Sequence, residues 1–166
     1  NALICFQAGD YKISDTVVIA GKGHLRLAGC GPGTRLFSSK SECVLRFENC
    51  PSVSVEHLAV HGGHSNAGNV NGALTFVNCG SVSVQHAVLA CRGFGSRSVA
   101  CVTVRNTVEA GALSSARIAG CDFSVGHLQT GILLINVSRS FVFDNILRAG
   151  DRPPNSELLQ DKGYRA

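Results

Sequence analysis

Two stretches of this chain repeat each other nearly residue for residue. Residues 45–60 read LRFENCPSVSVEHLAV and residues 74–89 read LTFVNCGSVSVQHAVL, so the second copy begins 29 residues after the first. Both copies contain the block N-C-x-S-V-S-V-x-H. A period of about 20–50 residues is typical of solenoids, propellers and other arrays of stacked units. The repeat therefore restricts this chain to folds in which equivalent segments stack.

The same frame extends along most of the chain. Asn49, Asn78, Asn106 and Asn136 are 29, 28 and 30 residues apart, and Gly21 takes the equivalent place 28 residues before Asn49. In a stack of coils these asparagines lie one above another at a turn, where each amide can bond the amide above it. We therefore predict a structural asparagine ladder formed by Asn49, Asn78, Asn106 and Asn136.

Apolar residues alternate with polar residues on both sides of each turn. This period of two predicts strands with one buried face. The alignment requires an insertion of about six residues after Asn106 and of one residue after Asn136, and insertions are expected at turns. The predicted inward residues before the turn are Val17, Ile19, Leu45, Phe47, Leu74, Phe76, Val102, Val104, Ile132 and Leu134. Those after the turn are Leu25, Leu27, Val53, Val55, Val82, Val84, Ala116, Ile118, Phe141 and Phe143.

A third recurring position follows the second strand. It is occupied by Gly29, His57, His86, Gly120 and Asn145. Glycine and asparagine adopt a left-handed backbone readily, and histidine is somewhat enriched there. We interpret this position as a bend between strands, and we favour that role for the stacked His57 and His86 over a metal site with two histidine ligands.

The repeat predicts an all-β right-handed parallel β-helix of about five to six coils, each of roughly 28 residues. A leucine-rich repeat would need the L-x-x-L-x-L-x-x-N pattern, and a propeller blade would need about 40 residues. Each coil has two or three short strands that pair with the coils above and below, about 4.8 Å away.

The opening FQAGDYKI (residues 6–13), the segment VVI (17–19) and LRLAGCGPGT (25–34) resemble the entry coils of the pectin-lyase-like superfamily. The repeats around Asn49 and Asn78 are similar to the β-helix repeat of that group. The resemblance covers about residues 2–150 and concerns the fold and the repeat. It implies a single-stranded β-helix, and it favours an extracellular or cell-surface location.

Residues 1–150 are predicted to form the β-helix, and residues 151–166 a polar C-terminal tail or cap. Asn155 or Ser156 is positioned to begin a short helix that ends near Gln160, with Leu158 and Leu159 over the last coil. Because the chain begins without a methionine and directly in an apolar run, we expect it to be part of a larger protein.

Charge and hydropathy limit the kinds of binding partner that we expect for this chain. The net charge is +4 and no run of basic residues occurs, so we do not expect nucleic acid. The longest apolar stretches have the length of strands, so we do not expect a membrane-spanning helix. The remaining candidates are a polysaccharide and, through the exposed coil ends, other copies of the chain.

The resemblance implies calcium as a candidate cofactor. Pectate lyases carry a V-W-I-D-H motif, and the acidic residue of that motif helps to bind calcium. Here Val55-Glu56-His57 takes that place, and the next coils carry Gln85, Ala119 and Asp144. Calcium prefers several carboxylates among its ligands. Neighbouring coils supply no carboxylate pair, so we expect neither calcium nor another cofactor.

The segments after the second strand are longer and gather at one edge of the stack. They contain the predicted ligand-binding residues His61, His64, Arg92, Phe94, Arg97 and His127. Arginine forks can hold carboxylates, and a phenyl ring can cover the apolar face of a sugar. We interpret this loop edge as a candidate carbohydrate site. A metal site at His61-x-x-His64 would lack the three or four ligands that it needs.

The eight cysteines leave the compartment open. Cys50 and Cys79 follow two ladder asparagines and are predicted to stack, as buried thiols or, in an oxidising compartment, as a disulfide.

The sequence contains a complete structural repeat but no complete set of catalytic residues. It therefore favours a non-catalytic module, either structural or carbohydrate-binding. One alternative is a polysaccharide lyase or glycoside hydrolase acting on an acidic polysaccharide through the loop edge, a lyase being preferred if the chain is an enzyme. The other is the shaft of a tail-spike or adhesin-like assembly.

Overall fold

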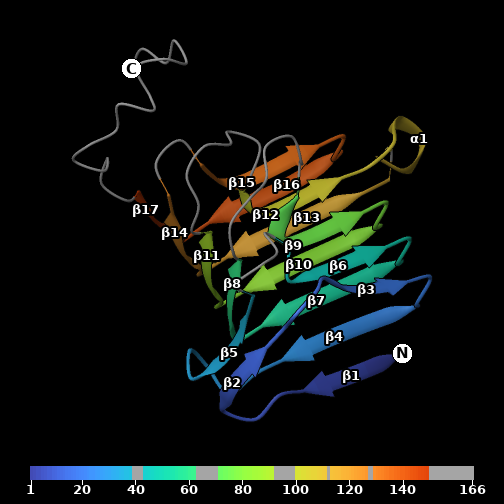
Figure 1. Ribbon diagram of the computed structural model, residues 1–166. Coiled ribbons are helices and arrows are strands. Elements are labelled where there is room, and N and C mark those ends of the chain that lie inside the picture. Colours follow the sequence, from blue (N-terminus) through green and yellow to red (C-terminus); the bar gives the residue numbers. More distant parts are fainter. Residues whose placement is uncertain (39–42, 63–70, 92–99, 112, 127–128, 150–166) are drawn as a thin grey trace.

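The computed structural model describes residues 1–38, 43–62, 71–91, 100–111, 113–126 and 129–149. These residues form three parallel sheets that wind into a β-solenoid, with successive levels rising from the N-terminus to the C-terminal strands (Figure 1). The predicted all-β parallel β-helix is thereby confirmed. The predicted helix within residues 151–166 lies outside the described residues.

Each sheet is made of every third strand. Sheet A contains β1 (Ala2–Cys5), β4 (His24–Ala28), β7 (Ser52–Glu56), β10 (Ser81–Gln85), β13 (Ser115–Ala119) and β16 (Arg139–Phe143). Sheet B contains β2 (Gly9–Lys12), β5 (Thr34–Phe37), β8 (Ala59–Gly62), β11 (Val88–Cys91), β14 (Asp122–Val125) and β17 (Ile146–Ala149). Sheet C contains β3 (Val17–Ala20), β6 (Leu45–Glu48), β9 (Gly72–Val77), β12 (Ala100–Arg105) and β15 (Thr130–Ile135).

The stack comprises about four turns, slightly fewer than the predicted five to six coils. At the two ends, β1 and β16 in sheet A and β2 and β17 in sheet B each have a neighbour on one side only. Every β-helix has two such open levels.

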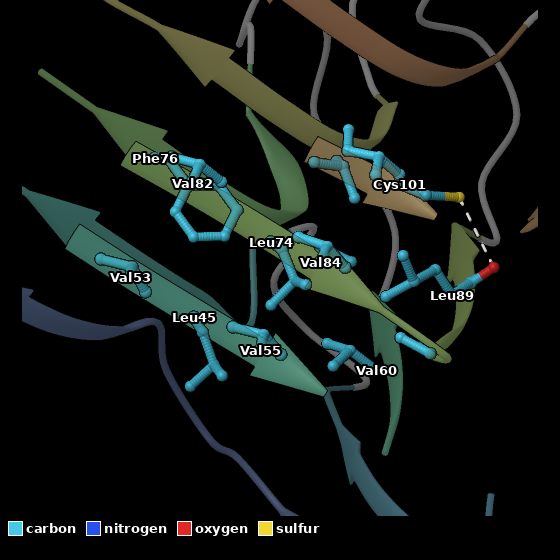
Figure 2. Close-up of a cluster of buried hydrophobic side chains, with 14 of the residues drawn as sticks. Leu45, Val53, Val55, Val60, Leu74, Phe76, Val82, Val84, Leu89 and Cys101 are labelled. Carbon is cyan, nitrogen blue, oxygen red and sulfur yellow. Dashed lines mark hydrogen bonds between the residues drawn. The ribbon is translucent and has the colours of Figure 1, made fainter. Parts of the chain in front are cut away.

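The predicted inward columns form the core of the inner turns. Leu45, Phe47, Leu74 and Phe76 from sheet C are buried, and the Phe47 and Phe76 rings stack at 5.1 Å with an interplanar angle of 12°. Figure 2 shows the side chains of Leu45, Leu74 and Phe76 beside the valines of sheet A in the interior. The valines concerned are Val53, Val55, Val82 and Val84.

Sheet B is only partly predicted by the sequence, in which several of its strand residues were expected to lie in loops. His61 lies in β8, Cys91 in β11 and Ser124 in β14. These strands begin within two residues of the bend, and they are too short to show a clear alternation.

The insertion after Asn106 is confirmed. It contains the short helix α1 (Val108–Gly111), and Ser115 then begins β13 in register with Ser81 of β10.

The predicted insertion after Asn136 is wrong, and the error changes the last level. Arg117 of β13 pairs with Phe141 of β16, and Ala119 pairs with Phe143. Because Ala116 and Ile118 point inward, Phe141 and Phe143 point outward. The inward positions belong instead to Ser140 and Val142, which pair with Ala116 and Ile118. The bend residue is correspondingly Asp144, with φ 54°, and not Asn145.

Within the described part of the chain, no helix has the length and apolar character needed to cross a bilayer.

Candidate functional site

The outer face of sheet A is a continuous surface whose six strands are all described. Its side chains alternate with the buried valines and leucines of the same strands. Two rows of serines cross its centre. One row consists of Ser52, Ser81 and Ser115, and the other of Ser54 and Ser83.

The C-terminal end of this face carries a basic–aromatic cluster, which we define as Arg117, Arg139, Phe141 and Phe143. Phe141 is 55% exposed and Phe143 is 40% exposed. The Arg117 guanidinium lies over the Phe143 ring, 4.8 Å from its centroid. Arg139 is exposed and pairs in register with Ser115. Two cations, two exposed rings and the end of a serine row therefore share one surface.

The charges of the cluster are available for a ligand. Among the described residues, the ion pairs join Arg26 to Glu56, Arg35 to Asp10, Arg46 to Glu48 and Arg148 to Asp122. Arg117 and Arg139 belong to none of these pairs. The cluster can therefore offer two guanidinium forks to an anionic group, the geometry that suits a carboxylate or sulfate.

The N-terminal half of the same face differs. Glu56, which takes the acidic place of the calcium motif, is bound by Arg26. Gln85 follows Glu56 on the next level and donates to Ser83 Oγ at 2.8 Å. Among the described residues, no three histidine, cysteine, aspartate or glutamate side chains come together as a metal ion would require.

The structure describes only one of the six residues of the predicted loop-edge site. His61 is half-buried on β8, where Ser38 N donates to its backbone carbonyl at 3.0 Å. The other predicted ligand-binding residues lie outside the described part of the chain. They are His64, Arg92, Phe94, Arg97 and His127.

His61 lies near an exposed ion pair on the outer face of sheet B. Arg35 Nε donates to Asp10 Oδ1 at 2.7 Å, and Arg35 also lies one level from His61's strand. The hydrogen bond and charge of Arg35, together with the charge of His61, hold the pKa of Asp10 below its ordinary value. The same hydrogen bond raises the pKa of Arg35. The pair is an ordinary surface contact that connects the first two levels of sheet B.

His57 and His86 form the predicted bend. Both are exposed, with φ of 53° and 50°, and their rings stack with centroids 5.1 Å apart. Gly120 continues the column with φ 63°. The bend prediction is thereby confirmed for these three positions.

The four turn asparagines occupy one column, and the side chains of Asn78, Asn106 and Asn136 bond to backbone groups. Asn78 Oδ1 accepts from Thr107 N at 2.9 Å, and Asn136 Nδ2 donates to Asn106 O at 2.8 Å. Asn106 Nδ2 donates to Asn136 O at 3.1 Å. Asn106 Oδ1 is buried without a partner in the described structure, and Asn49, Asn78 and Asn136 have φ of 52°. A ladder of amide-to-amide bonds through all four residues remains a prediction.

The basic–aromatic cluster was not predicted from the sequence, because an insertion after Asn136 would place Phe141 and Phe143 in the core. The signal that could have found them is the turn length. Arg139 follows Asn136 by three residues, as Ser52 follows Asn49 and Ser81 follows Asn78. That equal spacing requires no insertion, and it places both phenylalanines on the outer face.

Comparison of the chain with protein-family models, with curated proteins and with solved structures gives no match.

Proposed function

We propose that this chain is a non-catalytic β-solenoid module that binds an acidic polysaccharide on the outer face of sheet A. The observation that carries the proposal is the outward position of Phe141 and Phe143 beside Arg117 and Arg139. Large apolar side chains rarely stand exposed in a group on a protein surface unless a partner covers them. On the outer face of sheet A, this group stands beside two cations, Arg117 and Arg139.

The chemistry of the cluster suits a charged sugar. An exposed phenyl ring packs against the apolar face of a pyranose, and an arginine fork binds a carboxylate through two parallel hydrogen bonds. Neighbouring strands are about 4.8 Å apart, and alternate residues on one strand are roughly 6.6 Å apart. The four side chains therefore cover an area suited to one or two sugar residues. The serine rows extend this surface with hydroxyl groups for neighbouring sugars.

Affinity electrophoresis in gels that contain polygalacturonate tests the proposal. The wild-type chain should be retarded, and retardation should weaken with added salt because the arginines are exposed. Arg117→Ala and Phe141→Ala should each weaken binding about tenfold, the loss expected for a charged hydrogen bond or a large apolar contact.

Arg148→Ala is the control, because it removes the same charge from sheet B, one level further along the stack than Arg117. It should leave retardation unchanged. Equal weakening by Arg148→Ala would show a nonspecific charge effect, and no retardation of the wild type by any acidic polysaccharide would contradict the proposal. Incubation with the polymer should yield no unsaturated products and no new reducing ends. Release of unsaturated products would favour a lyase, and release of reducing ends alone would favour a hydrolase.

A second candidate is the shaft of an assembly, and the open end levels favour it. Leu3 and Ile4 are exposed on the first strand, and Val142 and Leu147 on the last two. Sedimentation measured over a range of concentrations distinguishes the two functions. Growth of the particle that is abolished by Val142→Glu but unaffected by Arg117→Ala would support the shaft.

A further inference from the structure

The corner between sheets B and C holds two thiols at one level of the stack. Cys91 ends β11 and Cys101 lies in β12, and both side chains are buried, at 1% and 0% exposure. Cys91 Sγ lies 2.8 Å from Ala100 O, next to Cys101 along the chain. Cys101 Sγ lies 3.7 Å from Leu89 O, a contact drawn in Figure 2.

The other levels show that this corner does not need sulfur for packing. The residues equivalent to Cys91 are Ser38, Gly62 and Val125, and those equivalent to Cys101 are Val44, Ala73 and Gly131. Small and aliphatic residues therefore fill the same place above and below. Cysteine occupies both positions at one level only among these four. At that level Cys91 Sγ lies 2.8 Å from the carbonyl oxygen of Ala100, the residue directly before Cys101.

We propose that Cys91 and Cys101 form a disulfide when the chain folds in the presence of a disulfide oxidant. One thiolate attacks glutathione disulfide and releases one glutathione, which leaves a mixed disulfide on the protein. The second thiolate then attacks the protein sulfur, forms the Cys91–Cys101 bond and releases the second glutathione. Two protein thiols lose their protons and two electrons, and one glutathione disulfide becomes two glutathione thiols.

The disulfide would tie together the ends of segment 92–100, which carries Arg92, Phe94 and Arg97. The inference is independent of polysaccharide binding on sheet A, because the corner and the basic–aromatic cluster lie in different sheets.

Burial determines when the bond can form. Exchange requires a thiolate that an oxidant can reach. Hydrogen bonding to Cys91 and burial both raise the pKa of the Cys101 thiol, and glutathione cannot reach either side chain in the folded state. The bond should therefore form during folding and only slowly afterwards.

The experiment refolds the reduced wild-type chain with glutathione disulfide, blocks the remaining thiols by alkylation, and maps tryptic peptides by mass spectrometry. Cleavage after Arg92 and Arg97 separates the peptide that contains Cys91 from the peptide 98–105 that contains Cys101. A covalent link between these two peptides is expected, with loss of two alkylatable thiols. The same oxidant added to the folded, reduced chain should give the link much more slowly.

Variants assign the link. It should disappear in Cys91→Val and in Cys101→Ala, which place residue types found at neighbouring levels into the corner, and it should persist in Cys79→Ser. The wild-type map alone can overturn the proposal, so the result does not depend on how well the variants fold. Recovery of peptide 98–105 with Cys101 fully alkylated after oxidative refolding would contradict it, as would a link that survives in Cys91→Val.

Discussion

At the scale of single residues, the bend between sheets A and B depends on backbone conformations that few side chains tolerate. Gly120 has φ 63°, and a Cβ added there would lie 2.7 Å from His86 Nδ1. Gly120→Ala should therefore destabilise the chain by about 1–2 kcal/mol, the cost of a left-handed alanine, with a further cost for the contact. Denaturant unfolding measures this difference.

Gly23→Ala is the matched control, because Gly23 has no atom within 4 Å of an added Cβ and no left-handed φ. It should leave the free energy of unfolding nearly unchanged. His86→Gly in the Gly120→Ala background should recover the contact part of the loss and leave the backbone part. Equal effects of Gly120→Ala and Gly23→Ala would contradict this account of the bend.

The Asp10–Arg35 pair gives a pH-dependent prediction. Because Arg35 lowers the pKa of Asp10 in the folded state, the pair stabilises the fold at pH values above the ordinary Asp10 pKa. That contribution is lost as the pH falls through the lowered pKa. Arg35→Gln should raise the pKa of Asp10, followed by NMR, toward its ordinary value of 3.8. Arg148→Gln, which removes a cation from the last level, should leave it unchanged, and an unmoved titration in Arg35→Gln would contradict the pairing.

At the scale of strands, the two kinds of phenylalanine should respond differently to truncation. Phe76 is fully buried and stacks on Phe47, so Phe76→Ala should cost about 3–5 kcal/mol by opening a cavity. Phe141 is exposed on the outer face of β16, so Phe141→Ala should change the free energy of unfolding by less than about 1 kcal/mol. A comparable loss of stability in both variants would show that Phe141 belongs to the core.

Strand columns could be predicted wherever each turn has the same length. The frame anchored on Asn49 and Asn78 placed Phe47, Phe76 and their valine partners in the core, as the structure has them. In β16, Phe141, Val142 and Phe143 are all apolar. The alternation of polar and apolar residues therefore does not show which of them point inward. A one-residue shift in register exchanges the two faces of a strand. The candidate site was missed for that reason.

At the scale of the whole molecule, stability should be distributed as in a one-dimensional stack. Each level contacts only its neighbours, so the end levels make half the contacts of the inner ones. Amide hydrogen exchange should be fastest in β1, β16 and β17, and slowest in β7 and β10, which have paired strands on both sides. Uniform protection along sheet A would contradict this view and would indicate that the ends are covered.

The proposed binding surface lies on one of these end levels and on a single face, so it can be located directly. The measurement is a titration of the isotope-labelled chain with an acidic oligosaccharide, followed through backbone amide shifts in NMR spectra. The account predicts that the largest shifts cluster in β13 and β16, around Arg117, Arg139, Phe141 and Phe143. Shifts confined to residues 61–70, 92–99 and 127–130 would instead place the ligand at the loop edge. Either that pattern or the absence of any shift would contradict the account.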